Sequence, residues 1–64
     1  MDSRTIIRRL EKEGWQLDRI TGSHHTFVKP GSSTIVTVPH PRKDLGKGLL
    51  RSIYRQAGWA WPPR

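Results

Sequence analysis

The spacing of apolar residues changes along this chain from a helical period to an alternating one and back again. In the first helical segment, apolar residues recur at intervals of three and four, namely Ile6, Ile7 and Leu10. We expect Ser3 to cap this helix and Gly14 to end it as a left-handed residue. Such an ending brings the residue after the glycine, Trp15, against Leu10 inside the helix.

The last part of the chain repeats this helical pattern. Its apolar stripe consists of Leu49, Leu50, Ile53 and Ala57. Gly58 is the expected stop. The start of this second helix is left open, because Gly46 and Gly48 both disfavour helix and Asp44 is only a candidate cap.

Between the helical segments, β-branched and aromatic residues accumulate and the period becomes two, which is typical of strands. The expected strands are residues 15–20, 25–29 and 34–38. The short connections favour an antiparallel meander, and Pro39 ends the third strand because proline cannot continue a ladder. The expected fold class is α+β in the order α-β-β-β-α, with both helices on one face of a three-stranded sheet and the other face mostly solvated.

The size of the chain allows one core at most, since a domain near 64 residues buries only about 60% of its unfolded surface. The sequence has no cysteine, so a disulfide framework or a cysteine-based zinc site is not available. No apolar run approaches the ~18 residues of a membrane span, and no signal-peptide core follows Met1. We expect a single domain over residues 1–59, a C-terminal tail over residues 60–64, and a cytoplasmic location.

The charge balance favours an anionic partner. Twelve basic and five acidic residues give a net charge of +7, and nucleic acid is the commonest partner of a small basic intracellular domain. A membrane surface is the rival. It is less favoured because the basic residues scatter over helices, turns and loops instead of lining one helix face.

Phosphate binding is expected near the start of the second helix, where free backbone amides carry partial positive charge. The basic residues expected there are Arg42, Lys43 and Lys47, and the residues that could extend this track are Arg19 and Lys29. Arg51 and Arg55 either join the track or form an ordinary solvated helix face, and the sequence favours neither interpretation.

Four stretches of the chain carry a family resemblance. They are Gly14-Trp15, RITGSHHTF at residues 19–27, VTVPHP at residues 36–41 and LRSIYRQAG at residues 50–58. Together they resemble the HicA family of toxins over roughly residues 3–59, and the Gly-Ser-His turn is the most specific element. The resemblance, with the element order and the basic balance, implies a double-stranded-RNA-binding-like fold.

The resemblance also implies an activity and a partner. HicA toxins are ribosome-independent mRNA interferases that a HicB antitoxin neutralises, so mRNA and a HicB-like protein are the expected partners. The family implies a catalytic histidine at His24, with Gly22 shaping the turn. Ser23 is either a phosphate donor or an ordinary turn residue. We expect a monomer when the chain is alone and a hetero-oligomer with the antitoxin.

RNA cleavage of this kind needs no cofactor, because RNA carries its own nucleophile. A deprotonated 2′-hydroxyl attacks the adjacent phosphate and expels the 5′-oxygen of the next nucleotide. The protein must then supply a proton acceptor, positive charge for the phosphorane and in-line geometry. Histidine suits the proton transfer, since the ordinary pKa of its side chain is about 6.5.

Neighbouring histidines on a strand point to opposite faces, so His24 and His25 do not line one site unless the turn distorts the strand. If Phe27 faces the helices, His25 shares its face and His24 is the accessible ring; if Val28 faces inward, the assignment reverses. His40 is a candidate second acid or phosphate ligand, or it only packs in its loop. Zinc binding by the three histidines matches no common spacing.

Two further functions remain as alternatives to a nuclease. A passive RNA-binding module of the same fold would use the basic helix start and leave RNA uncut. The chain could instead act mainly as one half of a repressor complex, with its basic face covered by the partner. Among the tryptophans, Trp59 is expected to anchor in the core, and Trp61 to dock the tail or stack a base.

Overall fold

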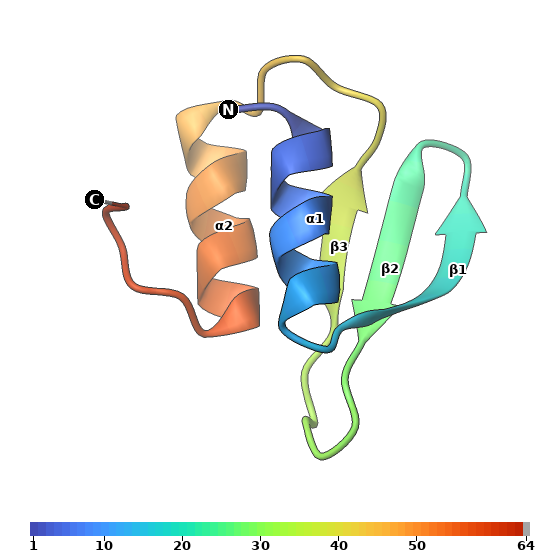
Figure 1. The fold of residues 1–64 in the computed structure, drawn as a ribbon. Coiled ribbons are helices and arrows are strands. Elements are labelled where there is room, and N and C mark those ends of the chain that lie inside the picture. The colour runs from blue at the N-terminus through green and yellow to red at the C-terminus, as the bar shows by residue number, and fades with distance from the viewer. Residues whose placement is uncertain (64) are drawn as a thin grey trace.

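The fold is known from a computed structural model, which describes residues 1–63. In order, its elements are α1 (Ser3–Lys12), β1 (Gln16–Thr21), β2 (His24–Val28), β3 (Val36–Pro39) and α2 (Lys47–Ala57) (Figure 1). The strands form one antiparallel sheet in the order β1-β2-β3. This arrangement confirms the expected α+β fold, with strand ends shifted by one or two residues. Neither helix in the described chain is long and apolar enough to cross a membrane.

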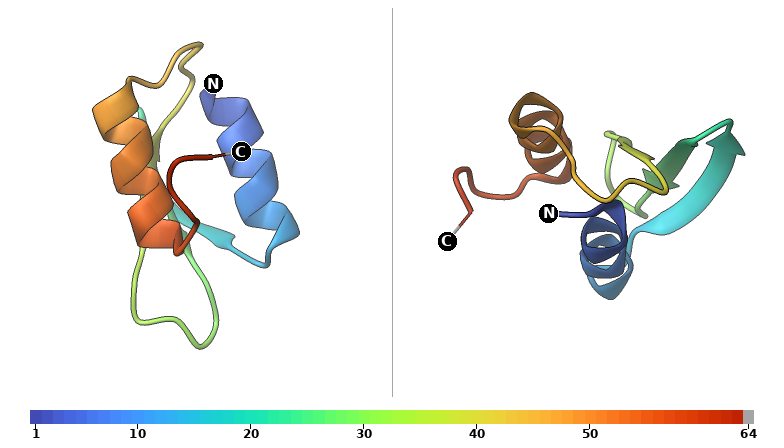
Figure 2. Two further views of the ribbon diagram at one scale, coloured as in Figure 1. Left: turned by 90° about the vertical axis from the view of Figure 1, so that its left-hand side faces the viewer. Right: turned by 90° about the horizontal axis from the view of Figure 1, so that it is seen from above.

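The two helices lie side by side on one face of the sheet, and β1 projects beyond them (Figures 1 and 2). Phe27 on β2 and Val36 and Val38 on β3 are at most 1% exposed, and they form the core together with apolar residues of both helices. All six residues of β1 are exposed, by contrast. The helices therefore cover β2 and β3 and leave β1 as a solvated edge strand.

The first helix begins differently from the sequence prediction. Asp2, and not Ser3, is its N-cap, and the Asp2 carboxylate accepts hydrogen bonds from Thr5 N at 2.9 Å and Thr5 Oγ1 at 2.7 Å. These bonds from Thr5 lower the pKa of the Asp2 carboxyl below its ordinary value. Ser3 is instead the first helical residue, and its side chain is buried. A cap needs an accessible side chain that turns back on its own helix, whereas Ser3 points inward.

Both helices end as the sequence predicts, on a left-handed glycine. Gly14 has φ +95° and Gly58 has φ +76°, values at which a side chain would be strained. After each glycine, a tryptophan amide returns to the helix. Trp15 N donates to Leu10 O at 2.9 Å and Trp59 N donates to Tyr54 O at 2.8 Å. The start of α2 has no side-chain cap: its N-cap is Gly46, so Asp44 does not cap the helix.

A cluster around Trp59 joins the ends of the two helices. Trp59 Nε1 donates to Glu13 Oε1 at 2.7 Å, and Arg9 Nε contacts Glu13 Oε2 at 3.1 Å. The Arg9 guanidinium also lies over the Trp59 ring, 3.9 Å from its centroid. Trp59 is buried in the core, as expected, and the hydrogen bond from Trp59 lowers the pKa of the Glu13 carboxyl.

Candidate functional site

One end of the molecule gathers the segments that carry the sequence-predicted site. The loop 40–46 and the starts of both helices lie at this end, beside the turn between β1 and β2 (Figure 1). Two backbone hydrogen bonds connect them. His40 N donates to Ser23 O at 2.7 Å, and Ser3 N donates to Arg42 O at 2.9 Å. The turn, the loop and the start of α1 therefore form one fixed surface.

Ser3 holds the ring of His40. The Ser3 side chain is buried, and its Oγ lies 2.7 Å from His40 Nδ1. The same oxygen accepts from Arg42 N at 2.9 Å and lies 3.2 Å from Arg42 O, to which it can donate. An unprotonated Nδ1 accepts the hydroxyl proton; a protonated Nδ1 donates to Oγ, whose own proton then points at the Arg42 carbonyl. The imidazole thus keeps its partner in either protonation state.

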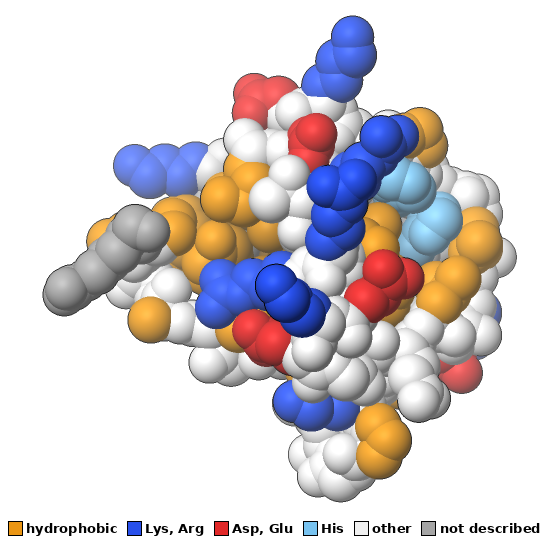
Figure 3. Space-filling view, in the orientation of Figure 1, with side chains coloured by type: hydrophobic (Ala, Val, Ile, Leu, Met, Phe, Trp, Pro, Cys, Tyr) orange, Lys and Arg blue, Asp and Glu red, His pale blue; other side chains and the backbone are white. Residues whose placement is uncertain are grey.

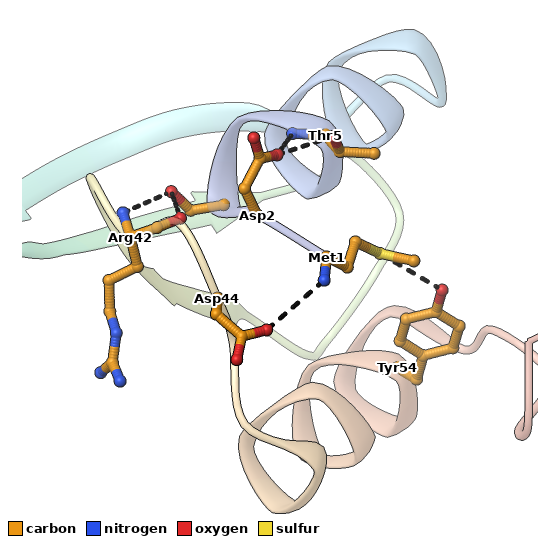
Figure 4. A network of polar contacts seen from close by, with 7 residues as sticks. Met1, Asp2, Thr5, Arg42, Asp44 and Tyr54 are labelled. Carbon is orange, nitrogen blue, oxygen red and sulfur yellow. Dashed lines mark hydrogen bonds and ion pairs between the residues drawn. The ribbon is translucent and has the colours of Figure 1, made fainter.

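Contacts with Met1 hold the loop that carries Arg42 (Figure 4). The N-terminal amine of Met1 lies 3.6 Å from Asp44 Oδ1, and the Tyr54 hydroxyl contacts Met1 Sδ at 3.9 Å. Arg42 engages α1 through its backbone, and its side chain extends away from that helix (Figure 4). The Arg42 guanidinium is therefore exposed for an outside anion.

The two neighbouring histidines lie on opposite faces of the sheet. Phe27 faces the helices, so the first of the two parity alternatives holds, and His24 is exposed on the open face, opposite Pro39 in the register. His25 lies on the helix side and is partly buried. Its ring meets that of His40 edge to face, with centroids 4.9 Å apart. The structure therefore brings the rings of His25 and His40 into contact and places His24 on the opposite face of the sheet.

A shallow hollow of about 470 Å³ lies beside His40. It is lined by Asp2, Ser3, Arg4, His40, Pro41, Arg42 and Lys43. Three of these side chains are cationic and one is acidic, so the hollow favours an anion. Figure 3 shows Lys and Arg side chains beside histidine on this face. A phosphate in the hollow would lie next to the imidazole that Ser3 orients.

The other predicted site residues are spread more widely. Lys29 follows β2 at the end opposite the turn, and its Nζ lies 5.8 Å from the Trp15 ring centroid, so the structure does not bring it to the histidines. Arg19 pairs with Thr26 in the register and lies on the open face, 3.9 Å from Asp18. Lys47 is the first residue of α2. Gly22 has φ +59°, a left-handed turn conformation.

Two residues near the site were not identified from the sequence. Ser3 has the pattern of a cap, and no local signal reveals that its hydroxyl meets a residue 37 positions away. Arg4 lines the hollow and reads in the sequence only as an exposed helix residue. Within residues 1–63, no group of three or more His, Cys, Asp or Glu side chains is arranged to hold a metal ion.

Fold and site together define a small, basic α+β domain of the double-stranded-RNA-binding-like type, with histidines and cations gathered at one end of its sheet. A family model described as the HicA toxin of bacterial toxin-antitoxin systems matches residues 3–59. A chain of a solved HicA3 and HicB3 toxin-antitoxin complex is 49% identical, with a TM-score of 0.77. The match covers 92% of this chain and 96% of that one. No curated protein sequence matches.

The chain therefore belongs to the HicA family of toxins. The family match covers every helix and strand described above and ends at Trp59, before the tail.

Proposed function

We propose that this protein is the toxin of a type II toxin-antitoxin system and that it cleaves mRNA without a ribosome or a metal ion. Its family membership and net charge of +7 support an RNA substrate. The observation that carries the proposal is the contact of His25 with His40 beside a cationic hollow. Because the substrate is mRNA, we propose the cytoplasm as the place of action.

The reaction uses the 2′-hydroxyl of RNA as the nucleophile. One imidazole takes the proton of that hydroxyl, the oxygen attacks the adjacent phosphorus, and the bond to the 5′-oxygen breaks. A second imidazole or a water returns a proton to this leaving oxygen, so the products are a 2′,3′-cyclic phosphate and a free 5′-hydroxyl. Arg4, Arg42 and Lys43 stabilise the negative charge that develops on the phosphorane.

Two assignments of the base compete. The family resemblance assigns it to His24, which is exposed beside the Gly22 turn and open to a long polymer. The geometry supports His25 with His40, because Ser3 orients His40, His40 lines the cationic hollow, and the His25 ring contacts that of His40. A catalytic group works best when its neighbours fix its position, which is the case for His40 and not for His24.

Three single alanine variants decide between these assignments. His24→Ala, His25→Ala and His40→Ala are compared with wild type on an end-labelled single-stranded RNA, with EDTA present and folding checked by circular dichroism. Loss of the base should cost about 10²–10⁴-fold in rate. A loss confined to His24→Ala assigns the base to the turn. A loss in both other variants, with His24→Ala active, assigns it to the pair. If all three variants cut at the wild-type rate, both assignments of the base are wrong.

A passive RNA-binding module is the second candidate, favoured by the cationic hollow alone. The same assay separates the two functions. Purified wild-type protein that binds the RNA and leaves it intact over long incubation supports the passive module.

We further propose a HicB-like antitoxin as the protein partner, since the similar solved chain comes from a complex of HicA3 with HicB3. A partner seated over loop 40–43 and the β1–β2 turn would exclude RNA by steric blockage. Lys43→Glu should then weaken the complex, whereas Lys12→Glu, at the far end of α1, should not. Inhibition that survives substitutions around the histidines would indicate inhibition from a distance.

A further inference from the structure

A second basic surface lies on α2, outside the histidine site. Lys47, Arg51 and Arg55 follow one another at intervals of four residues and are all exposed. That spacing places them on one side of a helix, about 6 Å apart along its axis. Residues 47–57 contain no acidic side chain. The stripe therefore presents three positive charges that its own helix does not neutralise.

The three residues of this stripe take no part in the ion pairs of the described chain. Arg9 is paired with Glu13 and Arg19 contacts Asp18, while the N-terminal amine faces Asp44. Within residues 1–63, no carboxylate lies within 4.0 Å of the charged groups of Lys47, Arg51 or Arg55. Uncompensated charges of one sign along a surface attract a polyanion.

An aromatic ring lies beside the two arginines. A hollow of about 420 Å³ is lined by Gly48, Arg51, Ser52, Arg55, Trp59 and Trp61. Trp59 is buried and its N–H is bound by Glu13, so it serves the core. Trp61 is partly exposed, and its ring meets Tyr54 edge to face with centroids 5.3 Å apart. The Trp61 ring is thus held in place and still accessible from the hollow.

We infer that this surface of α2 binds a single-stranded stretch of RNA, with one base stacked on Trp61 and its flanking phosphates on Arg51 and Arg55. A fixed aromatic ring beside cations is the arrangement that binds single strands without sequence preference. An acidic protein segment would use the cations and gain little from an exposed indole, so the ring favours nucleic acid. The inference rests on the proposed RNA substrate and adds a binding site that lies apart from the scissile phosphate.

The test measures binding separately from cleavage. The probe is a fluorescein-labelled 2′-O-methyl single strand of about 15 nucleotides, which lacks the nucleophile and so cannot be cut. Fluorescence anisotropy gives the Kd for wild type, Trp61→Ala, Trp61→Phe and the double variant Arg51→Ala/Arg55→Ala. The control is Arg8→Ala/Lys12→Ala, which removes the same charge from exposed positions of α1.

We expect Arg51→Ala/Arg55→Ala to raise the Kd about tenfold and to reduce the salt slope by about 1.4, since two phosphates contribute about 0.7 each. Trp61→Ala should raise the Kd about fivefold, and Trp61→Phe, which keeps a stacking ring, less than twofold. The Trp61→Ala effect should vanish on an abasic strand of equal charge. The control variant should change the Kd less than twofold.

Several results would overturn the inference. An equal loss in the control would mean diffuse electrostatic attraction, and wild-type protein that fails to bind the uncleavable strand would exclude the site. Unchanged RNA binding together with loss of HicB binding would assign the surface to the antitoxin. Because the probe cannot be cut, these results are independent of whether the protein cleaves RNA.

Discussion

Ser3 Oγ and His40 Nδ1 lie 2.7 Å apart, although they belong to the first helix and to the loop after the last strand. The same hydroxyl contacts both backbone groups of Arg42, so a single buried side chain ties α1 to the loop that bears the cations. This contact couples the stability of the fold to the position of a candidate catalytic ring.

Ser3→Ala should therefore reduce both stability and cleavage. It leaves His40 Nδ1 and Arg42 N without their partner in a partly buried place, which should cost about 1–3 kcal/mol in the free energy of unfolding. Urea unfolding followed by circular dichroism measures this loss. The control is Ser33→Ala in the exposed loop between β2 and β3, expected within about 0.5 kcal/mol of wild type. An unchanged free energy of unfolding in Ser3→Ala would show that the contact does not stabilise the fold.

Glu13 should make stability depend on pH. Its carboxyl pKa is lowered, first by the hydrogen bond from Trp59, so the folded state favours the charged form. The resulting stabilisation is complete above the ordinary glutamate pKa and is lost as the pH falls through the lowered folded value. We expect Glu13→Gln to cost about 1 kcal/mol at pH 7, allowing for solvent screening, and to reduce the fall in Tm between pH 5 and pH 3.

The matched control for this experiment is Glu11→Gln, an exposed glutamate on the same helix. Thermal unfolding at several pH values compares both variants with wild type. The same pH dependence in Glu13→Gln and wild type would exclude Glu13 as its source.

Two glycine substitutions should act in opposite directions. Gly22→Ala forces a side chain into φ +59° and should destabilise by about 1 kcal/mol, whereas Gly22→Asn should recover part of this loss. Gly48 lies in the first turn of α2, where an added Cβ meets nothing within 4 Å. Gly48→Ala should therefore stabilise by about 0.5–1 kcal/mol. Chemical denaturation measures the free energy of unfolding of both alanine variants. Changes in the same direction for Gly22→Ala and Gly48→Ala would contradict this account.

Chelation should not affect cleavage. The 2′-hydroxyl reaction uses imidazole and cationic side chains, so excess EDTA should leave the rate within about twofold of the untreated enzyme. The assay follows an end-labelled RNA with and without EDTA, then with added Mg²⁺ or Zn²⁺. A loss that one of these metals restores would refute the metal-independent proposal.

The predictable parts of this fold are those specified by neighbouring residues. The contacts of Trp15 with Leu10 and of Trp59 with Tyr54 follow from a glycine at a fixed offset, so sequence spacing is enough to find them. Strand alternation also predicts that His24 lies on the open face of the sheet, once Phe27 is known to be in the core. The order of the strands needed only their short connections.

Other features depend on which segments meet in space. The pattern of Ser3 is that of a cap, and only the approach of the loop around Arg42 turns it into a buried contact. Lys29 directly follows the strand that carries His25, but it lies beyond the end of that strand opposite the β1–β2 turn, so its charge alone did not locate it. Leu17 and Ile20 are apolar, but they are 48% and 55% exposed because the helices do not reach β1.

The solvated edge strand β1 has a consequence for the protein in isolation. Its outer row of amides and carbonyls is a template on which another chain can add a strand. Burial of the exposed Leu17 and Ile20 side chains would stabilise that pairing. Natural proteins blunt such edges with charges and kinks, and β1 carries both: Asp18 and Arg19 lie at the irregularity in its register. These two gatekeeper charges should protect the freed chain from fibrillar self-association.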